Sequence, residues 1–229
     1  MRTKERVEFI VQKLKETYPN AHCELDFKTP FQLLVATILS AQCTDKLVNI
    51  VTPGLFRKYP TPNELAAVAQ EELELAIKPT GFYRNKAKNL RAMSRDLLDK
   101  HRGEVPRSME ELTHLAGVGR KTANVVLGNA FSLAEGIAVD THVTRLAKRL
   151  ALTKSSVPEK IETDLMRLVP KQQWTDFSHL LIWHGRRRCF ARSPDCAECE
   201  IGSLCPSRDK FLKNAGSSGK AGIVKKAIA

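Results

Sequence analysis

The sequence predicts an all-α fold. Residues 7–14 place apolar side chains at positions i, i+3, i+4 and i+7, which is the spacing of one face of an amphipathic helix. Two capping boxes, Thr61–Glu64 and Ser108–Glu111, provide the hydrogen-bonding side chains that open helices. No segment alternates polar and apolar residues as a half-buried strand would, so we expect helices throughout.

Helical patterns follow one another along most of the chain. Phe31–Leu39 is apolar nearly all round and follows the N-cap candidate Thr29 and Pro30, which predicts a central buried helix. Thr44 and Asp45 are placed to cap the next helix. Further helical patterns cover 62–68, 71–77, a basic segment 84–95, the segments on either side of 115–119, and 141–150, 158–168 and 174–183.

Composition points to a polyanionic partner. The chain has 229 residues and a formal net charge of +12 at pH 7. Such an excess of Lys and Arg favours nucleic acid or an anionic membrane surface. No apolar run approaches the roughly 20 residues that span a bilayer, so we expect a cytoplasmic protein, associated with the nucleoid if it is bacterial.

A glycine turn joins two of the predicted helices. It contains Gly117, Val118 and Gly119, and Arg120 opens the helix that follows. Both glycines can take positive φ, so backbone N–H groups could point at an anion where the helix N-terminus adds its partial positive charge. The turn therefore predicts a site for a DNA phosphate, with a plain corner between helices as the alternative.

A cysteine cluster near the end of the chain is the most specific motif. Its spacing is C-x6-C-x2-C-x5-C, and zinc and a [4Fe-4S] cluster both accept four sulfur ligands. The single C-x2-C pair favours iron–sulfur, because zinc ribbons usually combine two such pairs. Cys23 and Cys43 are expected to be packed free thiols. The predicted metal ligands are Cys189, Cys196, Cys199 and Cys205.

Arginines crowd the first of these cysteines. We expect their charge to offset that of the thiolates and to meet DNA phosphates. They are Arg186, Arg187, Arg188 and Arg192.

Four ordered motifs together resemble the endonuclease III family of DNA glycosylases. They are Ser40–Asp45, the hairpin Leu115–Lys121, Val139–His142 and the cysteine loop. The resemblance implies an all-α protein of two domains with a DNA-binding cleft between them. It also implies removal of oxidised pyrimidines from damaged double-stranded DNA by a monomer that holds a [4Fe-4S] cluster.

The resemblance also implies where the domains lie. A six-helix barrel with the helix-hairpin-helix is expected at 25–133, and the cluster domain at 1–24 and 134–213. Residues 214–229 lie beyond the resemblance and are expected to form a flexible basic tail. Ala116 departs from the family, which commonly has proline there, and should loosen the hairpin slightly.

Two residues are the predicted catalytic groups. An amine at Lys121 can capture C1′ of the sugar and form a Schiff base, which permits β-elimination of the 3′ phosphate. Asp140 can stabilise the positive charge that develops on the sugar, and it can also cap the helix that follows. His142 is expected to be structural.

A base must leave the duplex to reach Lys121, so the gap must be filled. The resemblance suggests Gln42 and Phe82 as the residues that enter the DNA. A polar residue at a helix end and a phenylalanine anchoring a loop in the core are the alternatives. The basic segment 84–95, with Arg84, Lys86, Lys88, Arg91 and Arg95, faces either solvent or DNA.

Two other functions compete with this prediction. A monofunctional glycosylase of the adenine-mismatch type would activate water through the aspartate and would not need Lys121. A noncatalytic helix-hairpin-helix DNA-binding module would need the hairpin and the basic surface, but neither Lys121 nor Asp140.

Overall fold

The computed structural model describes residues 2–218, and over that range it contains helices and no strand. The all-α prediction is confirmed. The chain divides into two compact units, Cys23–Ala138 and a second unit that combines Met1–His22 with Val139–Ala229. The predicted barrel limits of 25 and 133 lie a few residues inside the first unit. The cleft between two domains, implied by the resemblance, stays a prediction.

The unit Cys23–Ala138 is built around one helix that is buried on nearly all sides. This is α2 (Pro30–Leu39), and Thr29 caps it by accepting a hydrogen bond from the backbone N–H of Gln32. Its apolar residues form the centre of the unit's core, as predicted. The other helices of the unit are α3 (Asp45–Lys58), α4 (Pro62–Ala67), α5 (Gln70–Ile77), the 3-10 turn η1 (Lys78–Thr80), α6 (Tyr83–His101), α7 (Met109–His114) and α8 (Arg120–Ala130).

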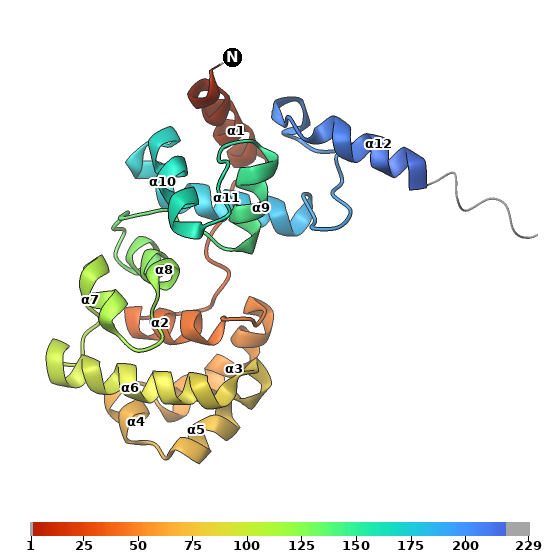
Figure 1. Cartoon of the computed structure of the whole chain (residues 1–229). Helices are drawn as coiled ribbons and strands as arrows, with labels where there is room; N and C mark the ends of the chain where they lie inside the picture. Colours follow the sequence, from red (N-terminus) through yellow and green to blue (C-terminus); the bar gives the residue numbers. More distant parts are fainter. Residues whose placement is uncertain (1, 219–229) are drawn as a thin grey trace, which may run out of the picture. The chain divides into compact units, whose positions relative to one another are not determined.

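The long helix α6 organises one side of this unit. It packs against α4 and α5, and α8 packs against α2 and α7 (Figure 1). Leu90, Met93 and Leu97 of α6 are fully buried. As a result the segments that enter and leave α2, α6 and α8 are held by a common core.

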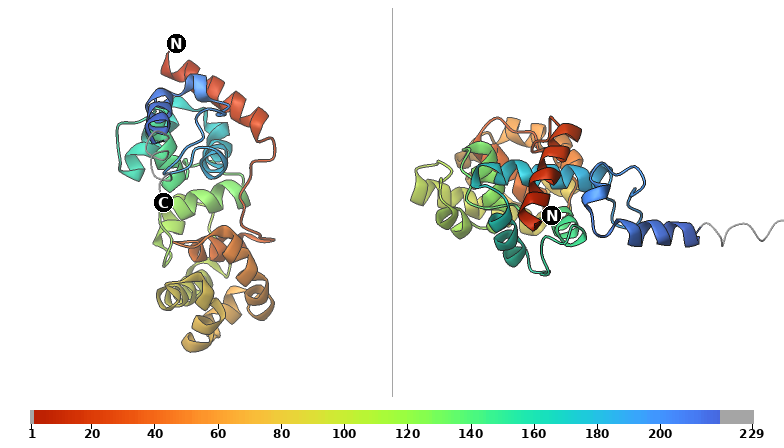
Figure 2. Two further views of the ribbon diagram at one scale, coloured as in Figure 1. Left: turned by 90° about the vertical axis from the view of Figure 1, so that its right-hand side faces the viewer. Right: turned by 90° about the horizontal axis from the view of Figure 1, so that it is seen from above.

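The second unit combines an N-terminal segment of the chain with a C-terminal one. Its helices are α1 (Thr3–Thr17), α9 (Thr141–Arg149), α10 (Pro158–Leu168), η2 (Lys171–Gln173), α11 (Trp174–Arg187), η3 (Gly202–Leu204) and α12 (Arg208–Ser218). The N-terminal helix α1 packs against α10 and α11, and α11 packs against α9 (Figure 2). Ile10, Leu14, Leu165 and Phe177 supply the buried contacts.

The end of the chain is helical for longer than expected. Helix α12 continues to Ser218, so residues 214–218 of the predicted flexible tail belong to a helix. The rest of that tail, 219–229, lies outside the described residues. Within residues 2–218, no helix combines the length and the apolar character needed to cross a membrane.

Candidate active site and metal centre

The glycine hairpin joins α7 to α8 through residues 115–119. Val118 is the buried anchor of the turn, and its N–H already donates to the carbonyl of Leu115 at 3.1 Å. Gly119 is the N-cap of α8 and supplies no side-chain acceptor. In the described part of the chain, the N–H groups of Gly117 and Gly119 have no backbone acceptor. These N–H groups, with those of the first turn of α8, suit an anion.

The two glycines are needed for different reasons. Gly117 has φ +76°, and a Cβ there would lie 2.9 Å from Cβ of Asn89 on α6. Gly119 has φ −96°, and a Cβ there would have no neighbour within 4 Å. The expectation of positive φ therefore holds for Gly117 only, and Gly119 leaves open space on the outer side of the turn.

Lys121 lies in the first turn of α8, directly after this hairpin. Its side chain and that of Arg120 are exposed. The buried residues Ala123, Asn124, Val126 and Leu127 fix the opposite face of the same helix. The sequence thus places an exposed primary amine at the positive end of a helix whose orientation the core determines.

Asp140 belongs to the other unit and is the N-cap of α9. Its Oδ1 accepts a hydrogen bond of 2.8 Å from the N–H of Val143, and its backbone carbonyl accepts one from Thr144. Its second carboxylate oxygen has no hydrogen-bond partner among the described residues, and the side chain is half-buried. The cap therefore orients the carboxylate and leaves one oxygen available for chemistry.

His142 packs inside the same unit. Its Nδ1 lies 3.1 Å from Nη2 of Arg145. A Cβ added to Gly185 of α11 would lie 2.9 Å from the same Nδ1 of His142. Burial lowers the pKa of His142, with Asp140 acting against the shift and Arg145 adding to it. This environment fits the structural role expected for His142.

Gln42 and Phe82 share an uncommon backbone conformation. Gln42 has φ +53° in the turn after α2, and Phe82 has φ +47° at the start of α6. Both side chains are exposed, Phe82 to 61%. The alternative of a phenylalanine anchored in the core is therefore wrong. Left-handed residues other than glycine cost energy and recur at functional sites.

The basic helix α6 does not present all its cations to the outside. Arg84 is exposed, lies over the ring of Tyr83 and pairs with Glu74 at 3.9 Å. Lys86 is 4% exposed, so for this residue both the solvent-facing and the DNA-facing alternatives are wrong. Burial lowers the pKa of Lys86.

The four predicted cysteine ligands line one cavity of the second unit. Arg149 of α9 donates from Nη1 to Sγ of Cys189 at 3.1 Å and to the carbonyl of Phe190 at 2.7 Å, which ties the loop to α9. Burial raises the pKa of Cys199 to about 11 and also raises the pKa of Cys196 and Cys205. Four sulfur donors on one cavity are a suitable ligand set for a metal centre bound through sulfur.

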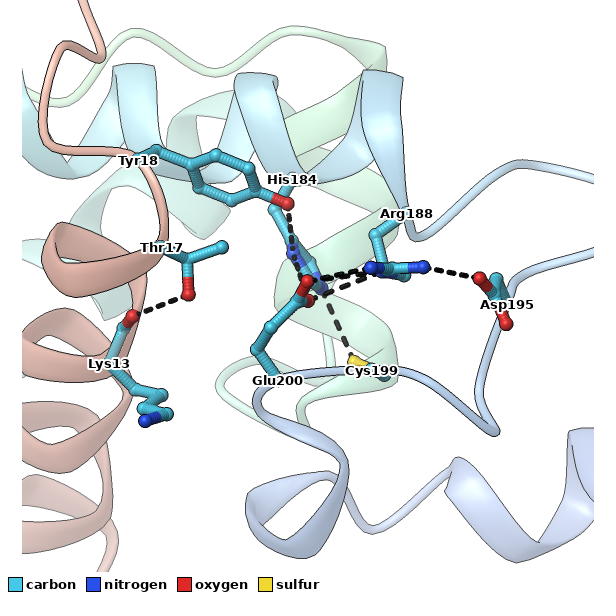
Figure 3. A network of polar contacts seen from close by, with 8 residues as sticks. All are labelled: Lys13, Thr17, Tyr18, His184, Arg188, Asp195, Cys199 and Glu200. Atoms are coloured by element: carbon cyan, nitrogen blue, oxygen red, sulfur yellow. Dashed lines mark hydrogen bonds and ion pairs between the residues drawn. The ribbon is translucent and has the colours of Figure 1, made fainter.

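A network of polar contacts connects Tyr18 and His184 to this cysteine loop (Figure 3). Tyr18, the C-cap residue that follows α1, hydrogen-bonds Nδ1 of the buried His184 at 3.1 Å, and Nε2 of His184 lies 3.5 Å from Sγ of Cys199. Burial lowers the pKa of His184 to about 4. The possible ligand atoms of His184, Cys199 and Glu200 all lie within 4.8 Å of one another. Spacing could not reveal this network, because Tyr18 and His184 are 166 residues apart.

Arg188 has a different role from the one expected. It donates to Glu200 at 2.8 Å and also pairs with Asp195, and these partners raise its pKa. The guanidinium thus joins two points of the cysteine loop, and it is Arg149 that contacts a cysteine sulfur, Sγ of Cys189. Cys23 and Cys43 form no disulfide within the described residues and pack against the core of the other unit, as predicted.

Comparison with known proteins places these features in a family. The model of the HhH-GPD superfamily of base excision DNA repair proteins matches residues 35–171. Endonuclease III of Synechocystis sp. is 55% identical over 89% of this chain and 93% of its own length, and that of Bacillus subtilis is 51% identical over 90% and 94%. The chain belongs to the endonuclease III family.

Solved structures of endonuclease III agree with this assignment. A non-covalent endonuclease III–DNA complex matches with a TM-score of 0.89 and 46% identity, over 93% of this chain and all of the other. A trapped covalent endonuclease III–DNA intermediate matches over the same shares with a TM-score of 0.87. The fold of the endonuclease III family is thus confirmed for this chain.

The superfamily match covers only part of the candidate site. Gln42, Phe82, the hairpin, Lys121 and Asp140 all lie within residues 35–171, whereas the four cysteines lie beyond it. The structure places Gln42, Phe82 and Lys121 in one unit and Asp140 in the other. Membership of the endonuclease III family rests on both regions, because the Synechocystis and Bacillus subtilis relatives match about nine tenths of the chain.

Proposed function

We propose that this member of the endonuclease III family removes oxidised pyrimidine bases from double-stranded DNA and then nicks the abasic strand by β-elimination. One observation supports both steps in particular. Lys121 is an exposed primary amine in the first turn of α8, directly after the hairpin, and the N-terminus of this helix has no side-chain cap. We further propose that the protein acts as a monomer in the cytoplasm, on damaged or abasic DNA of the nucleoid if it is bacterial.

The first chemical step is base release. Nζ of Lys121 donates its lone pair to C1′ while the bond from C1′ to the base breaks, and the base leaves with that electron pair and takes up a proton. The sugar is positively charged as the base departs. The carboxylate of Asp140, with one oxygen held by Val143 N–H, stabilises that charge.

The second step is strand cleavage. Opening of the sugar ring gives a Schiff base between Lys121 and C1′, which acidifies the proton on C2′. Removal of that proton lets the C3′–O bond break, and the phosphate leaves with the bonding electrons. Water then hydrolyses the Schiff base and frees the amine, so Lys121 serves both steps.

The hairpin and two exposed residues would hold the DNA. N–H groups of Gly117, Gly119 and the start of α8 bind a backbone phosphate, and Arg120 adds positive charge next to them. Val118 contributes through its position in the turn rather than through its buried side chain. Gln42 and Phe82 fill the space that the extruded nucleotide leaves.

The metal centre is proposed to be a [4Fe-4S] cluster held by Cys189, Cys196, Cys199 and Cys205. When bound, such a cluster cross-links its loop and supplies a redox centre. Arg149 and Arg145 orient the loop at Cys189, Arg145 through the backbone carbonyl of that residue. Iron analysis and the visible absorbance of the purified protein test the assignment, and a colourless, zinc-containing, active protein would contradict it.

Borohydride trapping tests the proposed reaction. The protein is incubated with duplex DNA that contains an oxidised pyrimidine, and the Schiff base is reduced to a stable adduct. We expect an adduct from the native chain and none from Lys121→Ala. Lys160→Ala, which removes an exposed lysine from α10, is the matched control and should be trapped fully.

Each alternative function gives its own result. Release of the base with no adduct from the native chain would support a monofunctional glycosylase. Binding of DNA with neither base release nor adduct would support a noncatalytic module. An undiminished adduct from Lys121→Ala would show that another amine is the nucleophile.

A further inference from the structure

Lys86 is a buried lysine that binds two carbonyl groups from separate segments of the chain. Its side chain is 4% exposed. Nζ donates to the carbonyl of Leu39 at 2.7 Å and to that of Thr80 at 2.8 Å. Leu39 is the last residue of α2, and Thr80 is the last residue of η1. One ammonium group thus connects the ends of two elements to α6.

This arrangement is costly as a source of stability alone. Lys86 forms no ion pair with any described carboxylate, and an unpaired buried charge is expensive to desolvate. The carbonyl of Leu39 ends a helix, where partial negative charge offsets part of that cost. An apolar side chain of similar length would fill the same space without the charge, so the two hydrogen bonds need a further explanation.

The segments that Lys86 holds are those that present Gln42 and Phe82. Gln42 follows Leu39 by three residues, and Phe82 follows Thr80 by two. Both residues are exposed and have left-handed backbone conformations. With such short connections, the two carbonyl positions limit where the two side chains can lie.

We propose that Lys86 is a positioning residue that sets the spacing between the Gln42 turn and the Phe82 loop, so that both side chains enter the DNA together. The inference rests on the proposed function, in which these residues fill the space of the extruded nucleotide. Lys86 itself touches neither the DNA nor the reacting atoms. Because both hydrogen bonds end on the same nitrogen, a shift of either segment is transmitted to the other.

The test compares Lys86→Met with the native chain on two substrates. Duplex DNA with an oxidised pyrimidine requires insertion into the helix, whereas single-stranded DNA with a preformed abasic site does not. We expect the single-turnover rate of base release from the duplex to fall by about tenfold, because a small misplacement near the reacting groups is enough to slow a reaction. Trapping on the single strand should be unchanged.

The matched control is Lys100→Met, which removes a 64% exposed lysine from the same helix. It should leave both substrates unaffected. A fluorescent adenine analogue opposite the lesion reports whether the unpaired base is unstacked, a signal that a purely structural role would not alter. We expect a smaller signal for Lys86→Met.

A double-mutant comparison completes the test. In a chain that already has Gln42→Ala and Phe82→Ala, the further change Lys86→Met should have no additional effect on the duplex. Equal losses on both substrates, an additive effect in that background, or an unchanged duplex rate would each overturn the proposal. If Lys86→Met does not fold, Lys86→Gln, which retains an N–H donor, replaces it in every arm. If the native chain formed no trapped adduct, that result would instead contradict the proposed function.

Discussion

The carboxylate of Asp140 combines a structural bond with a proposed catalytic role. One oxygen caps α9 through Val143, and the other has no hydrogen-bond partner among the described residues. Capping and charge stabilisation can be separated experimentally, because asparagine caps helices as well as aspartate does but carries no charge.

Asp140→Asn should therefore leave the fold intact and impair the reaction. We expect a change of less than about 0.5 kcal/mol in the free energy of unfolding. The single-turnover rate of base release should fall by about 10²- to 10³-fold. Asp140→Ala, which removes the cap as well, should lose about 1 kcal/mol of stability. Near-native base release by Asp140→Asn would contradict the catalytic role.

Single positions also show the limits of sequence analysis. The exposure of Lys121 and the cap at Asp140 could be predicted from local patterns, because both depend on neighbouring residues. The burial of Lys86 could not, since its partners Leu39 and Thr80 are 47 and 6 residues away. A lysine in a basic segment gives no signal that it faces inward.

The hairpin separates two uses of glycine. Gly117 adopts a left-handed conformation against Asn89, while Gly119 faces open space with ordinary φ. The first is a requirement of packing, and the second leaves room for a phosphate.

Alanine at each position should separate stability from binding. Gly117→Ala should lower the free energy of unfolding by about 2 kcal/mol, through a strained φ and a clash. Gly119→Ala should cost less than about 1 kcal/mol in stability but weaken DNA binding, because its methyl group would occupy the open space. Denaturant unfolding and equilibrium binding measure the two effects. Full DNA affinity in folded Gly119→Ala would contradict the phosphate site.

The cysteine loop depends on residues that its own spacing does not reveal. Its four cysteines could be found from sequence, but the arginine and histidine contacts come from α9 and α11. Arg188 joins Glu200 to Asp195 and so connects two sides of the loop.

Removal of that connection should loosen the proposed metal centre. If the centre is the proposed [4Fe-4S] cluster, we expect Arg188→Met to lose its iron to a chelator about tenfold faster than the native chain, since groups that orient ligands change metal affinity by this amount. Arg192→Met removes an exposed arginine of the same loop and is the control. Loss of visible absorbance with time is the measurement. Equal rates for the two variants would show that Arg188 does not secure the loop.

The chain as a whole is strongly basic, with a net charge of +12. Association with DNA should therefore weaken steeply as salt concentration rises, because each neutralised phosphate releases counterions. Arg120→Gln should reduce the slope of log affinity against log salt by about one phosphate contact. A titration at several salt concentrations measures this slope, and an unchanged slope would remove Arg120 from the DNA interface.

The fold could be predicted further than the site. Helical periodicity and caps are local, and they predicted an all-α chain with α2 at the centre. The catalytic pair could be proposed only from the resemblance, since Lys121 and Asp140 belong to different units. The helical residues 214–218 were missed because Gly216 and the two serines that follow it are typical of linkers.

The measurement that bears most directly on this account is the identity of the amine in the trapped adduct. The reduced complex with lesion-containing DNA is digested with protease, and mass spectrometry locates the modified residue. We predict a single modification on Lys121. A modification on any other lysine, or on the N-terminal amine, would contradict the proposed mechanism.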